Sequence, residues 1–222
     1  METMNASVML WLCMNIEREE IENKNVLEVG SQDVNGSIKD YVLKFRPSSY
    51  VGVDFQKGKN VDLVMNAEDL IEKLGPERFD VVISTEMLEH VKDWRKVIHN
   101  LKGVLKKGAL LIVTTRSQGF PYHAFPYDYW RYGIEDFERI FNDIQILKLE
   151  KDKEPGVLLK AKKPVDFSEV DTSTLKLFSV LTNKFELNAP PNPILSIRVK
   201  EQIKSLFNKV ETDVLLLFDR LL

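Results

Sequence analysis

The chain has 222 residues, of which 44% are hydrophobic and 29% are charged, the composition of an ordinary soluble globular protein. Its length suits one α/β domain with an appendage. The formal net charge of −3 leaves no strongly basic surface, so a nucleic-acid substrate is disfavoured. The single cysteine, Cys13, excludes an internal disulfide, and no Cys/His cluster has zinc spacing. This cysteine usage fits a cytoplasmic location.

Residues 1–22 are predicted to form an amphipathic helix that packs on the domain. The apolar run from Ser7 to Met14 is too short to span a bilayer, so no transmembrane segment is expected there. It lacks a basic flank before it, and an acidic stretch beginning at Glu17 follows it. These flanks are not those of a signal peptide.

The middle of the chain alternates strand-like and helix-like segments. Short runs rich in Val, Ile and Leu predict strands at Asn25–Val29, Tyr50–Asp54, Asp62–Val64, Phe79–Ser84 and Ala109–Thr115. Helical patterns lie between them at Gly36–Phe45, Ala67–Leu74 and Trp94–Leu105. This alternation predicts a doubly wound α/β fold with a mostly parallel sheet and right-handed crossovers.

The pattern changes after an aromatic loop. Ile134–Phe141 is predicted to be a helix, and Asp143–Lys151 with Gly156–Lys163 is predicted to be a β-hairpin. A hairpin would end the parallel sheet with an antiparallel strand. The core domain is therefore expected to span residues 23–164, followed by a helical extension at 165–222.

The extension contains one long apolar stripe. Steps of three and four residues join Val199, Ile203, Leu206, Val210, Val214, Leu217 and Leu221. The favoured interpretation is a helix that covers the sheet or a second copy of the chain, which would make a homodimer. An interfacial contact with a membrane is the alternative, although it calls for more Lys and Arg on the opposite face.

The first predicted strand runs into a loop that is suited to a small ligand. Glu28-Val29-Gly30-Ser31 ends the strand, and Gly36 opens the next predicted helix. Gly30 allows the backbone to approach a ligand because it has no Cβ atom, although a tight turn needs glycine equally. Three closely spaced glycines, the nicotinamide pattern, are missing, as is the Gly-Lys-Ser/Thr of a phosphate loop.

Two carboxylates lie at the ends of neighbouring predicted strands. Glu28 interrupts an apolar strand, and burying it without a partner would cost several kcal/mol. Asp54 ends the second strand, where an acid can accept hydrogen bonds from both hydroxyls of a ribose. An Asx-turn is the structural alternative for Asp54. Together the two acids indicate a cofactor that contains adenosine.

A second motif follows the fourth predicted strand. Ser84, Thr85 and Glu86 fall at its carboxyl end, next to the switch point where open α/β sheets bind ligands. The sequence continues as Met87-Leu88-Glu89-His90-Val91, and this segment is predicted to be helical. His90 would then lie one turn past Glu86 on the same helical face.

From Lys24 to about Lys163 the chain resembles the class I S-adenosylmethionine-dependent methyltransferases, in particular the branch whose first motif is Leu-Glu-Val-Gly-Ser followed by Asn-Gly-Ser. The resemblance implies a Rossmann-like seven-stranded sheet with an antiparallel last strand. It also implies S-adenosyl-L-methionine as the cofactor and S-adenosyl-L-homocysteine as the product.

The resemblance also assigns contacts to the cofactor. Glu28 would face its ammonium, Gly30 its methionine portion, and Asp54 its ribose. Asn66, in place of the usual acid, would meet the adenine together with Ala67, although Asn66 can also cap the next helix. The full predicted cofactor set is Glu28, Gly30, Ser31, Gly36, Asp54, Phe55, Asn66, Ala67, Ser84, Thr85 and Glu86.

The segment from Phe120 to Tyr132 is expected to recognise the acceptor. It follows the fifth predicted strand and holds many aromatic side chains, of which Tyr129, Trp130 and Tyr132 are expected to fill the core. An oxygen nucleophile must lose its proton, and the predicted catalytic residues are His123, then Asp128 or His90. Packing is the alternative role for His90. No metal site is predicted, because no spaced carboxylate set is present.

The predicted function is therefore methyl transfer from S-adenosylmethionine to a small-molecule acceptor by in-line displacement. Alignment of the nucleophile with the S–CH3 bond supplies much of the acceleration in such a reaction. Two alternatives stay open. One is a nicotinamide-dependent oxidoreductase of related fold, and the other is a non-catalytic cofactor-binding or dimerisation module.

Overall fold

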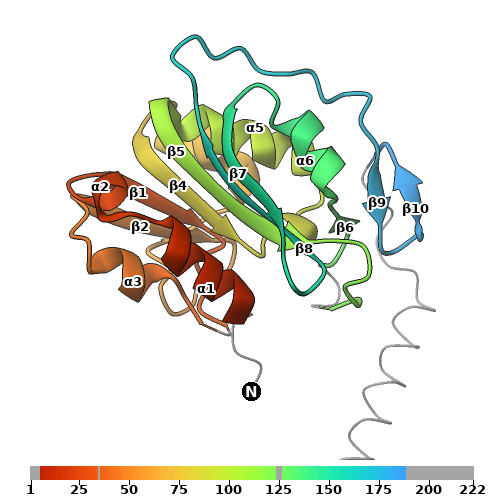
Figure 1. Ribbon diagram of the computed structural model, residues 1–222, viewed down its shortest axis with the longest axis horizontal. Helices are drawn as coiled ribbons and strands as arrows, with labels where there is room; N and C mark the ends of the chain where they lie inside the picture. Colours follow the sequence, from red (N-terminus) through yellow and green to blue (C-terminus); the bar gives the residue numbers. More distant parts are fainter. Residues whose placement is uncertain (1–5, 35, 124–126, 189–222) are drawn as a thin grey trace, which may run out of the picture. The chain divides into compact units, whose positions relative to one another are not determined.

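The computed structural model describes residues 6–34, 36–123 and 127–188. These residues form a seven-stranded sheet with helices on both faces, and a smaller three-stranded sheet beside it (Figure 1). The strands of the large sheet are β1 (Asn25–Val29), β2 (Ser49–Asp54), β3 (Leu63–Val64), β4 (Phe79–Thr85), β5 (Leu105–Arg116), β7 (Gln145–Lys151) and β8 (Gly156–Lys162).

The order of the large sheet is β3-β2-β1-β4-β5-β8-β7. The first five strands pair in parallel, whereas β8 is antiparallel to both β5 and β7. The strand order reverses direction between β1 and β4, which is the switch point of a doubly wound sheet. The predicted fold class, including the antiparallel last strand, is confirmed.

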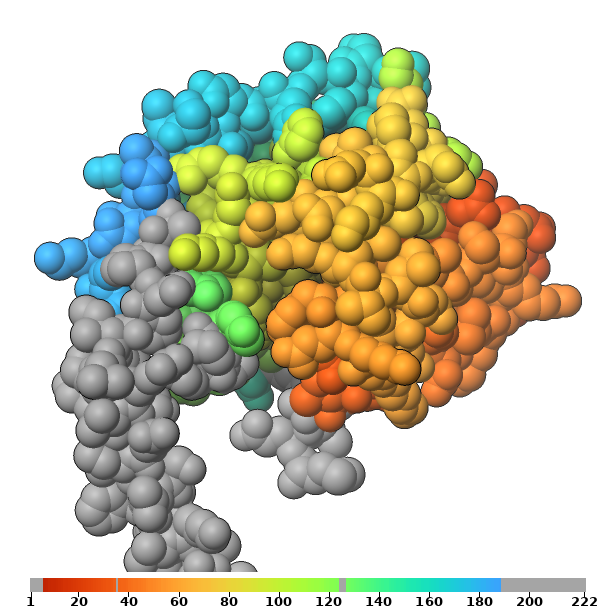
Figure 2. All heavy atoms as spheres, turned by 180° about the vertical axis from the view of Figure 1, so that it is seen from behind, coloured from red at the N-terminus to blue at the C-terminus, as the bar shows by residue number. Residues whose placement is uncertain are grey.

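Two apolar clusters hold helices to the two faces of the sheet. One face carries α1 (Ala6–Asn15), α2 (Arg18–Ile21) and α3 (Lys39–Leu43). The other face carries α4 (Leu70–Leu74), α5 (Trp94–Val104), α6 (Ile134–Ile140) and the short 3-10 helices η1 (Ala67–Asp69) and η2 (Leu88–His90). Figure 2, seen from behind, shows the yellow and yellow-green segments around α4 and α5 at the surface.

The helix after β1 is shorter than predicted. It begins at Lys39 rather than at Gly36. Gly36 is exposed, has a φ of 126° and donates its N–H to Asp33 Oδ1 over 2.9 Å. A glycine in that conformation closes a turn, so it cannot open the helix.

The prediction of a helical extension is wrong for its described part. Residues 165–188 contain the strands β9 (Leu177–Ser179) and β10 (Lys184–Glu186), and β9 pairs with β6 (Trp130–Arg131). Burial alternates along β9 because successive side chains of a strand point to opposite faces of the sheet. The stripe at 199–221, with its predicted dimer contact, lies outside the described residues.

Arg95 of α5 fixes this segment to the domain. Its guanidinium donates hydrogen bonds to the backbone carbonyls of Thr172, Leu175 and Leu187. The small sheet in turn supports the loop that follows β5, because Val180 N donates to the carbonyl of Tyr129. Within the described ranges, no helix is long and apolar enough to cross a bilayer.

Candidate cofactor and acceptor site

The loop after β1 folds back on the end of β2. The backbone N–H groups of Gly30 and Ser31 both donate to the carbonyl of Val53, over 2.9 and 3.1 Å. Because β1, β2 and β4 are parallel neighbours, the segments that follow them meet at one edge of the sheet. That edge is the usual position of a ligand site in such sheets.

Gly30 is required by packing as well as by conformation. Its φ is 82°, and a Cβ atom there would lie 2.8 Å from Cβ and Cγ of Met87, in the loop after β4. The two loops therefore touch through a position where only glycine fits. The structural reason for this glycine holds whether or not a ligand is bound.

Asp54 joins two loops at the end of β2. Its Oδ2 accepts the N–H of Gln32 over 3.2 Å, and its Oδ1 accepts the N–H of Gln56 over 3.0 Å. The bond to Gln56 confirms the Asx-turn. Each carboxylate oxygen has a second lone pair, so these bonds leave the carboxylate able to accept hydroxyl donors.

Glu28 is buried and paired with a tyrosine. Its side chain is 2% exposed, and Oε2 accepts the hydroxyl of Tyr50 over 2.7 Å. Burial raises the pKa of Glu28 to about 7, although the bond from Tyr50 opposes the rise. Next to this strand end, Ser31 is buried too, and its hydroxyl has no hydrogen-bond partner among the described residues. These groups fit a polar ligand at the end of β1.

The residues expected beside adenine follow β3. Asn66 Oδ1 accepts the N–H of Glu68 over 3.0 Å, which confirms the capping role. The carbonyl of Ala67 accepts a side-chain N–H of Asn100 over 2.9 Å. Phe55 is 54% exposed after β2, where an aromatic face is free to contact a base.

At the end of β4, each carboxylate oxygen of Glu86 contacts a side chain of β5. The hydroxyl of Thr114 donates to Glu86 Oε1 over 2.8 Å, and Arg116 forms an ion pair with Oε2. Burial and then repulsion from Glu89 raise the pKa of Glu86 to about 8, while Arg116 opposes the rise. Ser84 and Thr85, just before it, are buried.

The prediction that Glu86 and His90 share a helical face is wrong. Glu86 has a φ of 52°, and η2 begins only at Leu88. A residue with positive φ cannot continue a right-handed helix. The turn at Glu86 redirects the chain, so that Glu89 and His90 face the loop after β5 instead.

Glu89, His90 and His123 form the cluster that we call the EHH cluster. Glu89 is fully buried, and its Oε2 accepts the hydroxyl of Thr115 over 2.7 Å. Its Oε1 lies 3.8 Å from His90 Nε2 and 4.0 Å from His123 Nε2. The two imidazole rings meet edge to face with centroids 4.8 Å apart. Two of the three predicted catalytic residues are therefore neighbours.

Asp128 lies next to this cluster and contacts His123. Arg131 contacts both of its oxygens, over 2.5 and 2.8 Å, and the backbone N–H of His123 donates to Oδ2 over 2.7 Å. Burial alone would raise the pKa of Asp128, but the bonds from Arg131 and His123 hold it at about 2. A fully buried carboxylate with these partners is a poor base. These contacts suit a residue that positions His123, and the predicted catalytic role of Asp128 stays a prediction.

The loop after β5 contacts both the segment after β2 and the EHH cluster. Tyr127 contacts Phe55 edge to face with centroids 5.6 Å apart, and its carbonyl lies 2.6 Å from His90 Nδ1. Tyr129, Trp130 and Tyr132 are buried, as predicted. Sequence reasoning missed Glu89, Arg116 and Arg131 as members of the site. Glu89 lay within the motif after the fourth predicted strand and Arg131 within the Phe120–Tyr132 segment, whereas Arg116 lay in neither.

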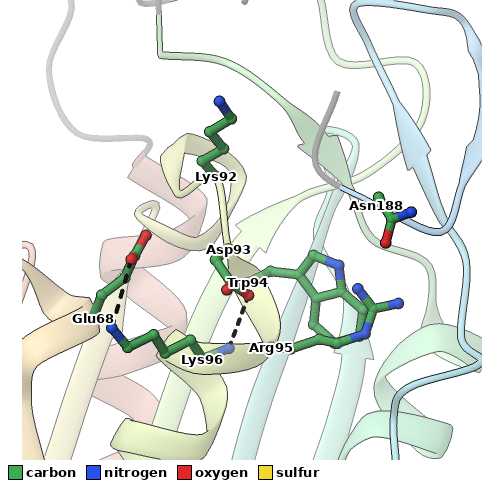
Figure 3. Close-up of a pocket in the computed structure, with 7 residues that line it drawn as sticks. All are labelled: Glu68, Lys92, Asp93, Trp94, Arg95, Lys96 and Asn188. Carbon is green, nitrogen blue, oxygen red and sulfur yellow. Dashed lines mark hydrogen bonds and ion pairs between the residues drawn. The ribbon is translucent and has the colours of Figure 1, made fainter. Parts of the chain in front are cut away.

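A separate hollow of about 520 Å³ lies at the start of α5 (Figure 3). Its lining is Glu68, Lys92, Asp93, Trp94, Arg95, Lys96 and Asn188. Lys96 Nζ lies 4.0 Å from Glu68, Asp93 caps α5, and Arg95 is held by three carbonyls. These charges serve structural contacts, so we place the site at the EHH cluster and the Gly30 loop.

Sequence comparison places most of the domain in one family. Residues 12–150 match the family described as the methyltransferase domain. A similar protein is the ubiquinone biosynthesis O-methyltransferase of Pseudomonas syringae pv. tomato, 33% identical over 45% of this chain and 47% of that protein. Its counterpart in Pseudomonas fluorescens matches to the same extent. The chain spans about half the length of these relatives.

Solved structures agree on the fold. A Burkholderia thailandensis 1,6-didemethyltoxoflavin-N1-methyltransferase, with 1,6-didemethyltoxoflavin and S-adenosylhomocysteine bound, has a TM-score of 0.59 at 12% identity, over 72% of this chain and 80% of that one. An S-adenosylmethionine-dependent methyltransferase from Mesorhizobium loti has a TM-score of 0.55 at 13% identity, over 72% and 99%. Given the match to residues 12–150, the chain belongs to the methyltransferase domain family.

Proposed function

We propose that the protein transfers a methyl group from S-adenosylmethionine to a nucleophilic atom of a small molecule. The observation that carries this proposal is the contact between Gly30 and Met87. It joins the bare backbone loop after β1 to the segment that leads directly into the EHH cluster. A cofactor on that loop would therefore have its reactive end beside the imidazoles.

The residues around the β1 and β2 ends fit an adenosylated amino acid. Asp54 would accept the ribose hydroxyls, and the exposed Phe55 would cover the base. Glu28, held by Tyr50, would lie behind the loop that takes the methionine portion. When bound, S-adenosylmethionine supplies an activated methyl group, so the protein has mainly to align the acceptor and exclude water.

At the acceptor end, His123 is suited to take a proton from an oxygen nucleophile. Its Nε2 lies 4.0 Å from Glu89 Oε1, and its Nδ1 lies 3.1 Å from Asp128, which also accepts the backbone N–H of His123. Such a base contributes about 100-fold or more to a rate in comparable sites. The names of the relatives support small-molecule acceptors with oxygen or nitrogen nucleophiles.

The test is transfer of label from methyl-labelled S-adenosylmethionine in an extract of small metabolites. The proposal expects label in a small-molecule product that disappears when His123 is changed to Ala. Label confined to protein or nucleic acid, or none above a reaction without enzyme, would contradict it. A cytoplasmic location and a homodimer through residues 199–221 stay predictions from the sequence.

A further inference from the structure

We propose that Arg116 is a positioning residue for methyl transfer, because its guanidinium holds both imidazoles of the EHH cluster in place. Arg116 acts on His123 through Phe120 and on His90 through Glu86. The consequence for the reaction rests on the proposed function. The consequence for the two imidazoles rests only on the contacts described below.

Arg116 is the last residue of β5, and only 6% of it is exposed. Its partners come from three different segments. Its Nε forms an ion pair with Oε2 of Glu86, in the turn after β4, and its guanidinium carbon lies 4.2 Å from the ring centroid of Phe120. Its Nη1 lies 3.6 Å from Asp152 and 3.9 Å from Glu154, between β7 and β8. A planar guanidinium with acids at both ends and a ring against it keeps one orientation.

Phe120 links Arg116 to His123. The N–H of Phe120 donates to the carbonyl of Ser117 over 3.1 Å, so the chain turns back directly after β5. The Phe120 ring, besides its contact with Arg116, meets the imidazole of His123 edge to face with centroids 5.1 Å apart. His123 in turn meets His90 edge to face over 4.8 Å. A change at Arg116 therefore reaches the proposed base through a single aromatic ring.

Glu86 links Arg116 to His90. Its φ of 52° is rare for a residue other than glycine, and such a conformation persists only where the surroundings hold it. Strand β5 holds it here: the backbone N–H of Glu86 donates to the carbonyl of Thr114 over 2.9 Å, and its carboxylate contacts Thr114 and Arg116. The helix η2, which ends at His90, begins two residues later. The turn at Glu86 therefore decides where His90 lies.

The two links close a circuit of contacts. It runs from Arg116 to Phe120, His123 and His90, and it returns along η2 and Glu86 to Arg116. In a closed circuit of packed groups, no member moves without displacing its neighbours. Methyl transfer depends on such precision, since a shift of about 1 Å in a reacting group can cost roughly 100-fold in rate.

A purely structural role is the alternative for Arg116, which neutralises the buried Glu86 and contacts the hairpin of β7 and β8. The position of Phe120 favours the positioning role. Among the described residues, Phe120 is only partly buried and belongs to neither of the two apolar clusters of the domain. An aromatic ring outside the core that contacts a guanidinium and an imidazole contributes to the site more than to the core.

The first measurement follows the imidazoles by NMR spectroscopy of the full chain with labelled histidine. In the wild type, we expect nuclear Overhauser effects between Phe120 and His123 and between His123 and His90. Arg116→Lys keeps a positive charge opposite Glu86 but loses the planar group against Phe120. The effect between Phe120 and His123 should therefore disappear, and the ring signals of His123 should shift. Arg116→Gln also removes the charge, so the signals of His90 should shift as well.

The second measurement compares initial rates of label transfer from methyl-labelled S-adenosylmethionine to an extract of small metabolites. Arg116→Gln should lower the rate at least about tenfold, and Arg116→Lys should lower it less, because the ion pair with Glu86 survives. The dissociation constant for S-adenosylmethionine, measured by calorimetry, should stay close to that of the wild type. A general loss of structure would instead weaken cofactor binding together with the rate.

Phe120→Leu provides a second variant, since Arg116→Gln leaves the buried Glu86 without its charged partner and is expected to unfold more easily. Phe120→Leu breaks one link and keeps the ion pair intact. It should lower the rate and shift the signals of His123. Combined with Arg116→Lys, it should lower the rate hardly further, because both changes act on the same contact. Circular dichroism verifies the folded state of each variant.

Arg18 provides the matched control. It combines the same two kinds of partner, an ion pair over 3.4 Å with Glu22 and an aromatic ring, that of Phe45, at 5.6 Å. It is exposed, however, and lies in α2, away from the ends of β4 and β5 that carry the EHH cluster. Arg18→Lys should therefore leave the imidazole signals and the rate unchanged.

Two results would overturn the positioning role of Arg116. One is a set of His90 and His123 signals that Arg116→Gln and Phe120→Leu leave unchanged. The other is a wild-type rate in these variants, which would refute the positioning role while the proposed function stands. A wild type that neither binds S-adenosylmethionine nor transfers label would refute the proposed function, and the NMR comparison would still decide whether Arg116 holds the imidazoles.

Discussion

Gly30 and Met87 pack so closely that a Cβ atom on Gly30 would lie 2.8 Å from both Cβ and Cγ of Met87. Gly30 follows β1 and Met87 follows β4, so this contact spans the switch point of the sheet. It fixes the distance between the loop after β1 and the segment that carries Glu89 and His90. The fold and the candidate site are coupled at this glycine.

Replacing Gly30 with Ala should therefore damage both stability and binding. Gly108→Ala is the matched control, because its φ of 77° is close to the 82° of Gly30 but nothing lies within 4 Å of the added atom. We expect Gly108→Ala to cost about 1 kcal/mol from backbone strain alone. Gly30→Ala should cost about 1–3 kcal/mol more and weaken cofactor binding. Equal losses in urea unfolding would show that the Met87 contact is unimportant.

Asp54→Ala should weaken the binding of S-adenosylmethionine at least about tenfold. The reason is the loss of two charge-assisted hydrogen bonds of roughly 1 kcal/mol or more each. Since Asp54 also accepts the N–H groups of Gln32 and Gln56, Asp54→Asn serves as a second variant that keeps one acceptor for the loops. An unchanged dissociation constant in calorimetry for both variants would remove Asp54 from the site.

Glu28 should make the protein less stable as pH rises. Burial raises its pKa from an ordinary 4.5 to about 7 in the folded state. The folded state then binds more protons than the unfolded one between these values. The free energy of unfolding should fall across that window by about 3 kcal/mol from this group.

Urea unfolding across that pH range checks the effect of Glu28. In Glu28→Gln, the part of the fall in the free energy of unfolding that Glu28 causes should disappear. The part caused by Glu86, whose pKa is raised to about 8, should remain. Tyr50→Phe removes the bond that lowers the pKa of Glu28, so the loss of stability should continue to higher pH. A slope that is identical in the wild type and Glu28→Gln would refute the assignment.

Breaking the buried pair of Asp128 and Arg131 should cost about 3–5 kcal/mol, because it leaves an unpaired buried charge. We expect this loss for Asp128→Asn in chemical denaturation. Asp171→Asn, at an exposed acid, should change stability by less than about 0.5 kcal/mol. Replacing both partners by apolar residues should recover part of the loss. A single variant as stable as the wild type would contradict the positioning role of Asp128.

The sequence predicted the parallel core well because its signals are local. Buried runs such as Asn25–Val29 coincide with β1, and the hairpin around Lys153 appears as β7 and β8. The antiparallel position of β8 followed from the same hairpin pattern. These elements depend on short-range hydrophobic periodicity and turn residues.

The remaining elements depend on contacts between distant segments. β6 has two residues and exists only because β9 pairs with it, so neither strand has a sequence pattern of its own. In the site, Asp54 was identifiable as a strand-end acid. Glu89 can be assigned to the candidate site only from its contact with His123 of the loop after β5. That contact depends on the Asp128–Arg131 pair.

The most direct measurement of the central claim is a calorimetric titration of the purified chain with S-adenosylmethionine and, separately, with NADH. Our account predicts saturable binding of one S-adenosylmethionine per chain and no binding of NADH, because the three spaced glycines of a nicotinamide site are missing. Saturable binding of NADH with none of S-adenosylmethionine would contradict the account.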